Sequence, residues 1–391
     1  MLCISALWAI GRWNWQGTKG PSIVRGSKAT AVTQIPPRPP DALPPIKTKP
    51  TLPHEKVRHE CLKHIRTRQA QVLNDLDRTT PPLLIDPAYH RNVGDSMITY
   101  GERSFLGSVD ECRYVQAHAS MPACRDDGQH SLWWHGGGNW GDLWPQVQQA
   151  RIQSLEDFPD SSIISFPQSL YYRDKQRERQ DAVVLNNARW ILMWREHESF
   201  ERAQELYPLA KHLLVPDIAF QLGPYESGPP QFDLLFLLRN DHESIYAEYR
   251  SRSALKPIVG DVSYTIVDWE DRMEIFGDEN YLFTDRAIEL LSMGRVVICD
   301  RLHAAILAYI SGLPFVYLDQ ESGKVSKTLR VAFESWDGCQ NGDASAWKGA
   351  STMPQAVERA LELLQDHGGQ VDRSSERRRK REALRQANGV V

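Results

Sequence analysis

The sequence has no Cys-x-x-Cys pair. Its six cysteines are scattered over 391 residues. Zinc sites and dense disulfide frameworks both need clustered cysteines, so we expect neither. We also expect no metal ion and no cofactor. A single disulfide between Cys112 and Cys124 is left open.

A long hydrophobic run is missing as well. The N-terminal apolar stretch covers only residues 2–10, whereas a membrane-spanning helix needs about 20 apolar residues. No basic segment precedes it, as a secretory signal would require. We therefore expect no clear membrane span and favour a disordered leader over the remnant of a membrane anchor. An anchor remnant would place the protein in the Golgi or secretory pathway, and a plain leader would leave it cytoplasmic.

The chain also lacks the excess of positive charge that nucleic-acid binders normally carry. Its formal net charge is −4, so we expect no nucleic-acid partner. No Asn-x-Ser/Thr sequon occurs, which weakly disfavours a glycosylated secretory protein. The tail, residues 371–391, is basic and predicted to be helical. A solvated helix end explains it better than a nuclear-localisation signal.

What is present is an alternation of short apolar runs and helix-like segments. Residues 1–53 are predicted to be a disordered leader and a Pro-rich linker, and a charged helix is predicted over 54–77. The alternation that follows is typical of parallel sheets covered by helices on both faces. The predicted strands are 82–86, 132–135, 162–166, 190–194, 212–217, 233–238, 263–268, 295–299 and 315–318. The predicted helices are 95–106, 144–155, 174–189, 198–206, 281–293, 302–311 and 354–366.

The segment "GPYESGPPQ", residues 223–231, interrupts this alternation with three prolines and two glycines. The sequence therefore predicts an N-terminal α/β domain over 54–222 and a C-terminal α/β domain over 232–370. Both are expected to be Rossmann-like, doubly wound domains that face each other across a cleft. Ligands of such sheets bind beyond the carboxyl ends of the strands.

Two segments of the N-terminal half combine glycine with polar side chains. In "RNVGDSMITYGE" (91–102), Gly94 permits a tight turn and Asp95 can cap a helix whose N-terminus could bind an anion. In "HSLWWHGGGNWGD" (130–142), His135 ends a strand and a glycine triplet follows. Glycines there would let a ligand approach the main chain, and Asn139 could bind a sugar hydroxyl.

The strongest local signal is "VVICDRLHAAILAYISGLPFVYLD" (296–319). A predicted strand ends at Asp300, and Arg301 and His303 open the next helix. Two cations at a helix N-terminus are unfavourable for the helix dipole. The arrangement becomes favourable if an anion binds there, because dipole, arginine and histidine then all attract it.

The motifs GD, HGGGN, WREHES, PD-x-AF, LLRND, DRLHA, GLP and GK occur in this order. Over roughly residues 85–335 the chain resembles the polysaccharide pyruvyl transferase family. The resemblance implies a glycosyltransferase-B-like fold. It also implies transfer of pyruvate from phosphoenolpyruvate to a sugar residue of a glycan, forming a ketal. Golgi members of the family carry one N-terminal anchor helix, and this sequence departs from them there.

This chemistry assigns roles to the residues singled out above. Phosphoenolpyruvate carries a phosphate and a carboxylate, and arginine binds both kinds of group through two nitrogens. Histidine can donate or accept a proton near neutral pH. The predicted donor-binding residues are Asp95, Arg195, Arg301 and Lys324. The predicted catalytic residues are His303 as acid and His135 as base, and the predicted acceptor-binding residues are Gly136, Gly137, Gly138 and Asn139.

Two other functions stay open. A glycosyltransferase that uses a nucleotide sugar could employ the same architecture and the same cationic helix N-terminus. An inactive carbohydrate-binding relative is the second alternative. Against the latter, a binding module has no need of two histidines and two arginines at strand ends.

Overall fold

The computed structural model describes both halves of the folded body. The described residues are 53–76, 80–90, 92–107, 109–115, 121–125, 130–241, 243–270, 280–320, 322–341 and 346–367. The predicted leader, the Pro-rich linker and the basic tail lie outside them. Within these ranges, no helix has both the length and the apolar character needed to cross a bilayer.

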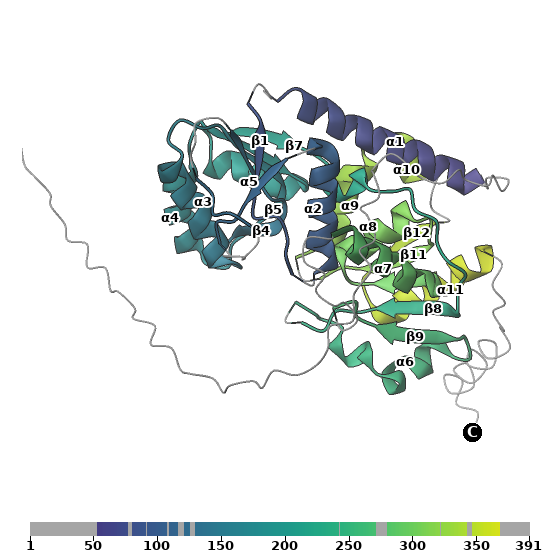
Figure 1. The fold of residues 1–391 in the computed structure, drawn as a ribbon. Helices are drawn as coiled ribbons and strands as arrows, with labels where there is room; N and C mark the ends of the chain where they lie inside the picture. The colour runs from purple at the N-terminus through teal and green to yellow at the C-terminus, as the bar shows by residue number, and fades with distance from the viewer. Residues whose placement is uncertain are drawn as a thin grey trace, which may run out of the picture. The chain divides into compact units, whose positions relative to one another are not determined.

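The first sheet has seven parallel strands in the order β2-β1-β3-β5-β6-β7, with β4 paired to β5. Figure 1 labels β1, β4, β5 and β7 of this sheet. Its strands are β1 (Pro82–Ile85), β2 (Asp110–Cys112), β3 (Ser131–Trp134), β4 (Gly137–Gly141), β5 (Ile163–Tyr171), β6 (Trp190–Trp194) and β7 (Lys211–Leu214). The helices of this half are α1 (Pro53–Asn74), α2 (Val93–Leu106), α3 (Pro145–Asp157), α4 (Lys175–Leu185) and α5 (His197–Leu206), and the 3₁₀ turn η1 (Ile218–Gln221) follows.

The second sheet has five parallel strands in the order β12-β11-β10-β8-β9. Its strands are β8 (Phe232–Leu237), β9 (Tyr264–Val267), β10 (Gly294–Cys299), β11 (Phe315–Leu318) and β12 (Trp347–Ala350). The helices of this half are η2 (Ala247–Arg250), α6 (Arg252–Val259), α7 (Asn280–Ser292), α8 (Leu302–Ile310), α9 (Lys324–Phe333), α10 (Asp337–Asn341) and α11 (Met353–Asp366).

Both sheets reverse their strand order at the same kind of place. In the first sheet β1 lies between β2 and β3, and in the second β8 lies between β9 and β10. In doubly wound sheets, ligands bind at the carboxyl ends of the two strands that flank such a reversal. The topology therefore predicts a ligand site at the residues that follow β1, β3, β8 and β10.

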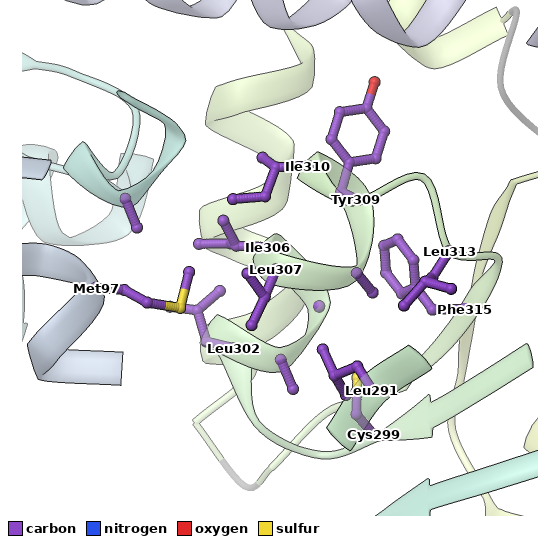
Figure 2. Close-up of a cluster of buried hydrophobic side chains, with 14 of the residues drawn as sticks. Met97, Leu291, Cys299, Leu302, Ile306, Leu307, Tyr309, Ile310, Leu313 and Phe315 are labelled. Carbon is purple, nitrogen blue, oxygen red and sulfur yellow. The ribbon is translucent and has the colours of Figure 1, made fainter. Parts of the chain in front are cut away.

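Strands buried on both faces explain why the sequence reads as continuous apolar runs. Trp133 and Trp134 are adjacent in β3 and point to opposite faces, yet both are almost fully buried. The helix α8 is apolar on every side for the same reason. Figure 2 shows its side chains enclosed by neighbouring elements, with Met97 of α2 beside Leu302 and Ile306. The helix that follows β10 is thus held in place from several directions.

Elements of the N-terminal half also pack on the C-terminal half. The helix α2 contacts α7 and α8, and α1 contacts α9 and α10. A disulfide between Cys61 and Cys339 joins α1 to α10. The scattered spacing gave no hint of this bridge. The Cys112–Cys124 bridge that the sequence left open is formed.

Several predicted boundaries need correction. The glycine triplet is not an open turn, because Gly137 begins β4, which pairs with β5. Lys324, for which no helix was predicted, begins α9. The cap of α2 is Asn92, whose side chain accepts the N–H of Gly94, and Asp95 lies in the first helical turn. The division into two domains at 54–222 and 232–370 stays a prediction.

Candidate active site

One cavity of about 600 Å³ collects the residues that follow the strands at both reversal points. Asp86 follows β1 and His135 follows β3 in the first sheet. In the second sheet, Arg239 lies just beyond β8 and Arg301 just beyond β10. Eight of the ten predicted site residues line this cavity, namely Asp95, His135, Gly138, Asn139, Arg195, Arg301, His303 and Lys324.

Gly136 and Gly137 do not line the cavity. Contacts within the protein account for the lack of a side chain at both positions. A Cβ on Gly136 would lie 3.0 Å from the carbonyl oxygen of Pro167, in β5. Gly137 has φ +114°, which disfavours any side chain, and a Cβ there would meet Ile98 at 3.3 Å. These glycines let β4 approach β5 and α2, and their role in binding the acceptor stays a prediction.

His135 is held by a buried carboxylate. Its Nδ1 lies 2.8 Å from Oε2 of Glu102, while Oε1 of Glu102 accepts the N–H of Gly136 at 2.7 Å. Burial acts to lower the pKa of His135, but the charge and hydrogen bond of Glu102 outweigh it and raise that pKa. Among the described residues, Nε2 of His135 has no hydrogen-bond partner. The contact with Glu102 thus occupies Nδ1, and Nε2 is the ring nitrogen that is left without a partner.

His303 lies against the N-terminal turn of α2. A Cβ on Gly94 would come within 2.4 Å of Nδ1 of His303, so only glycine leaves room for the ring. Nε2 of His303 lies 3.5 Å from Oδ2 of Asp217 and, among the described residues, makes no hydrogen bond. The GD and DRLHA motifs, far apart in sequence, thus meet through Gly94 and His303.

A group of cations lies beside Gly138. A Cβ there would be 3.3 Å from Nη2 of Arg195 and 3.8 Å from Nζ of Lys324. Arg195 is almost fully buried and donates to Oδ2 of Asp217 at 2.6 Å and to the hydroxyl of Ser169 at 2.9 Å. Although burial acts to raise the pKa of Asp217, the charges of Arg195 and His303 hold it well below its usual range. Asp217 therefore stays ionised and ties Arg195 to the histidine.

Burial lowers the pKa of Lys324, and the nearby charges of Arg195 and Arg239 add to that effect. The carboxylate of Glu243 opposes it from 3.4 Å. The same carboxylate accepts a hydrogen bond from Arg239 at 2.8 Å. Glu243 thus bridges two cations that line the cavity.

Arg301 is surrounded by carboxylates. It donates to both oxygens of Asp268, at 3.0 and 2.8 Å, and Nη1 lies 3.0 Å from Glu270. Burial would lower the pKa of Arg301, but the bonds to Asp268 reverse that effect and raise it. Arg301 therefore stays protonated at the N-cap of α8, and its role in binding an anion stays a prediction.

The opposite wall is built around a buried guanidinium. Arg151 of α3 is inaccessible to solvent and lies over the ring of Trp140, with 4.8 Å to the ring centre. It donates to the carbonyl oxygen of Asn139 at 2.9 Å and also to the Asn139 side-chain oxygen. Because burial is so complete, the pKa of Arg151 falls to about 9. With its oxygen bound to Arg151, the amide of Asn139 has its NH₂ group left for a ligand.

Sequence reasoning missed several residues of the site. Asp217 stands in the PD-x-AF motif and Glu102 in the segment 91–102, but both lie in elements remote from their partners, so the sequence did not show which side chains they contact. Asp86 and Arg239 could have been found, because each follows an apolar strand as His135 does. Within the described residues, no group of three or more His, Cys, Asp or Glu side chains is placed to hold a metal ion.

The comparisons with known proteins agree with this geometry. The model of the polysaccharide pyruvyl transferase family matches residues 92–322. Pyruvyl transferase 1 of Schizosaccharomyces pombe is 31% identical over 306 residues, covering 70% of this chain and 73% of that protein. General stress protein 30 of Bacillus subtilis is 24% identical over 268 residues, covering 64% of this chain and 76% of that protein.

A solved structure of a functionally uncharacterized protein from Klebsiella pneumoniae aligns with a TM-score of 0.46 at 19% identity, covering 68% of this chain and 93% of that one. The family match spans more than half of the chain and includes both halves of the cavity. The chain belongs to the polysaccharide pyruvyl transferase family, and it is a pyruvyl transferase that acts on a glycan.

Proposed function

We propose that the donor is phosphoenolpyruvate and that the product is a pyruvate ketal on a sugar of the glycan. The observation that carries the proposal is a buried imidazole, His135, and a partly buried one, His303, in a cavity that arginine and lysine side chains also line. His135 and His303 each leave Nε2 without a hydrogen-bond partner among the described residues. Arg195, Arg301 and Lys324 supply positive charge in the same cavity.

The reaction needs these groups and nothing further. Protonation of the methylene carbon turns the donor's C2 into an oxocarbenium-like centre. One sugar hydroxyl adds to C2 and the bond from C2 to the phosphate oxygen breaks. A second hydroxyl then closes the ketal. Of the two hydroxyl protons, one replaces the proton given to the methyl group and the other leaves with the phosphate, so the overall step balances without water.

The geometry supports a division of labour between the two histidines. We assign His303 as the acid on the donor side, because Arg195 and Lys324 lie near it and would hold the phosphate. We assign His135 as the base, because Glu102 fixes its Nδ1 and increases its basicity. A carboxylate that orients an imidazole in this way is a recurrent device of acid–base catalysis. Asp95, predicted to bind the donor, carries a negative charge and fits an acceptor hydroxyl better.

A nucleotide-sugar-dependent glycosyltransferase was the alternative that the sequence left open, and membership of the pyruvyl transferase family disfavours it. It would also use cations against a phosphate, but it has no use for an acid that protonates a carbon. An inactive binding relative is disfavoured by the family membership. Donor choice separates the two active candidates.

The test is incubation with phosphoenolpyruvate and a panel of p-nitrophenyl glycosides. We expect phosphate release that depends on the sugar and a mass gain on it of one pyruvate less one water. His303→Ala and His135→Ala should each lower turnover by about 10²–10⁴, the usual contribution of one placed acid or base. His197→Ala is the control, since this histidine pairs with Glu334 outside the cavity. Turnover of nucleotide sugars instead would overturn the proposal.

A further inference from the structure

One large side chain of the cavity, Trp144, is exposed and makes no hydrogen bond or ring contact with the described residues. Trp144 lines the cavity, yet 45% of it is exposed. By contrast, Trp134 and Trp140 beside it are 1% exposed and pack against other rings or against Arg151. Other apolar side chains are also exposed, but Trp144 is exposed inside the cavity, where a ligand could cover its apolar surface.

The backbone holds Trp144 rigidly. It is the N-cap of α3, and Pro145 occupies the first helical position. Its carbonyl oxygen accepts the N–H groups of Val147 at 3.0 Å and Gln148 at 3.2 Å. An aromatic ring on such a fixed element presents its face with little loss of conformational entropy when a ligand binds.

The surroundings of Trp144 match a sugar. A pyranose ring has an apolar face of C–H groups and an edge of hydroxyls. Trp144 offers an apolar face, and Asn139 offers an amide NH₂ group because Arg151 binds its oxygen. Gln146, two residues after Trp144, lines the same cavity. Aromatic surface with a few placed polar groups is the usual composition of a specific small-molecule site.

We propose that Trp144 is the stacking surface for the sugar next to the one that receives pyruvate. This inference rests on the proposed function. The sugar that reacts must reach His135, which is 6% exposed, whereas 45% of Trp144 is exposed to solvent. The following sugar of the chain therefore lies on the indole. The acceptor is then a glycan end of at least two residues, recognised partly through its second sugar.

The test compares acceptors of one and two sugars. The probes are methyl glycosides of glucose, galactose, mannose and N-acetylglucosamine, each paired with the methyl glycoside of its 1,4-linked disaccharide. A methyl aglycone is needed because a nitrophenyl ring would itself stack on Trp144. The wild-type protein should prefer the disaccharide of its sugar by roughly 5- to 30-fold in kcat/KM, which corresponds to about 1–2 kcal/mol. Trp144→Ala should remove this preference and leave the monosaccharide and the KM of phosphoenolpyruvate unchanged.

Two controls make the result specific. Trp144→Phe keeps an aromatic face and should keep most of the preference. Leu209→Ala removes an exposed apolar side chain outside the cavity and should change nothing. A disaccharide preference that survives Trp144→Ala would overturn the inference and leave the proposed function intact. Absence of phosphoenolpyruvate turnover by the wild-type protein on every probe would overturn both.

Discussion

The contact between Gly94 and His303 makes a sharp prediction at the scale of single residues. Gly94 lies inside α2, so alanine suits its backbone, but a Cβ would meet Nδ1 of His303 at 2.4 Å. The imidazole would have to move away from Asp217. Gly94→Ala should therefore lower kcat about 10- to 100-fold, part of the usual contribution of a placed acid. Steady-state kinetics check this, with melting by circular dichroism to show that the fold persists.

Gly228→Ala is the matched control for that substitution. A Cβ on Gly228 would make only an ordinary contact, 3.7 Å from the side chain of Ser292. Its activity should equal that of the wild-type protein. If Gly94→Ala were as active as Gly228→Ala, the ring of His303 would not be acting from the position described.

The pair formed by His135 and Glu102 predicts a change in pH dependence. The carboxylate of Glu102 raises the pKa of His135 against the opposing effect of burial. In Glu102→Gln that charge is gone, so the pKa of His135 falls. If His135 is the base, activity rises with pH as it loses its proton, and this acidic limb of kcat/KM moves to lower pH. Movement of the alkaline limb instead would make His135 the acid, and an unmoved profile would remove it from the proton transfer.

At the scale of elements, the sequence predicted the apolar strands and their helices well. Burial on both faces leaves little choice of residue in a parallel strand, so β3 and β10 were evident. The strands β2, β4 and β12 were not, because Asp110–Cys112, Gly137–Gly141 and Trp347–Ala350 hold few apolar side chains. Such strands form because they pair with neighbouring strands of the sheet. A short stretch of sequence does not show this pairing, because the partner strand lies elsewhere in the chain.

The segment after β8 makes a prediction about donor affinity. Glu243 in this segment contacts both Arg239 and Lys324. Its carboxylate therefore competes with a donor anion for these two positive charges. Glu243→Gln removes this competition, and we expect the KM for phosphoenolpyruvate to fall by about 3- to 10-fold, with kcat changed less. Kinetics with varied donor check this. The control is Glu362→Gln, which breaks an exposed pair with Lys348 and should leave the KM unchanged. If the KM of Glu243→Gln rose instead, the carboxylate of Glu243 would be supporting the donor site.

At the scale of the whole molecule, the site depends on partners brought together from distant elements. Glu102 comes from α2, Asp217 precedes η1, and His303 belongs to α8. The sequence marked the histidines and arginines because they stand at strand ends. It did not show which carboxylates orient them, since those contacts exist only in the folded chain.

The long-range disulfide is a second whole-molecule feature and predicts a difference in stability. Cys61 and Cys339 are 278 residues apart, whereas Cys112 and Cys124 are separated by 12. Loop-closure entropy assigns about 5 kcal/mol to the longer loop and about 3 kcal/mol to the shorter one. Replacing Cys61 and Cys339 by serine should therefore lower Tm more than replacing the other pair. Calorimetry with and without reductant checks this, and equal losses would contradict it.

The central claim is that this cavity joins pyruvate to a glycan through one carbon bonded to two sugar oxygens. Phosphoenolpyruvate labelled with ¹³C at C2 tests it most directly, with the product sugar followed by NMR. We predict that the label appears as a quaternary ketal carbon coupled to the protons on two sugar carbons, and that His303→Ala abolishes the signal. Label found only in free pyruvate, or in an ester linked through a single sugar oxygen, would contradict the account.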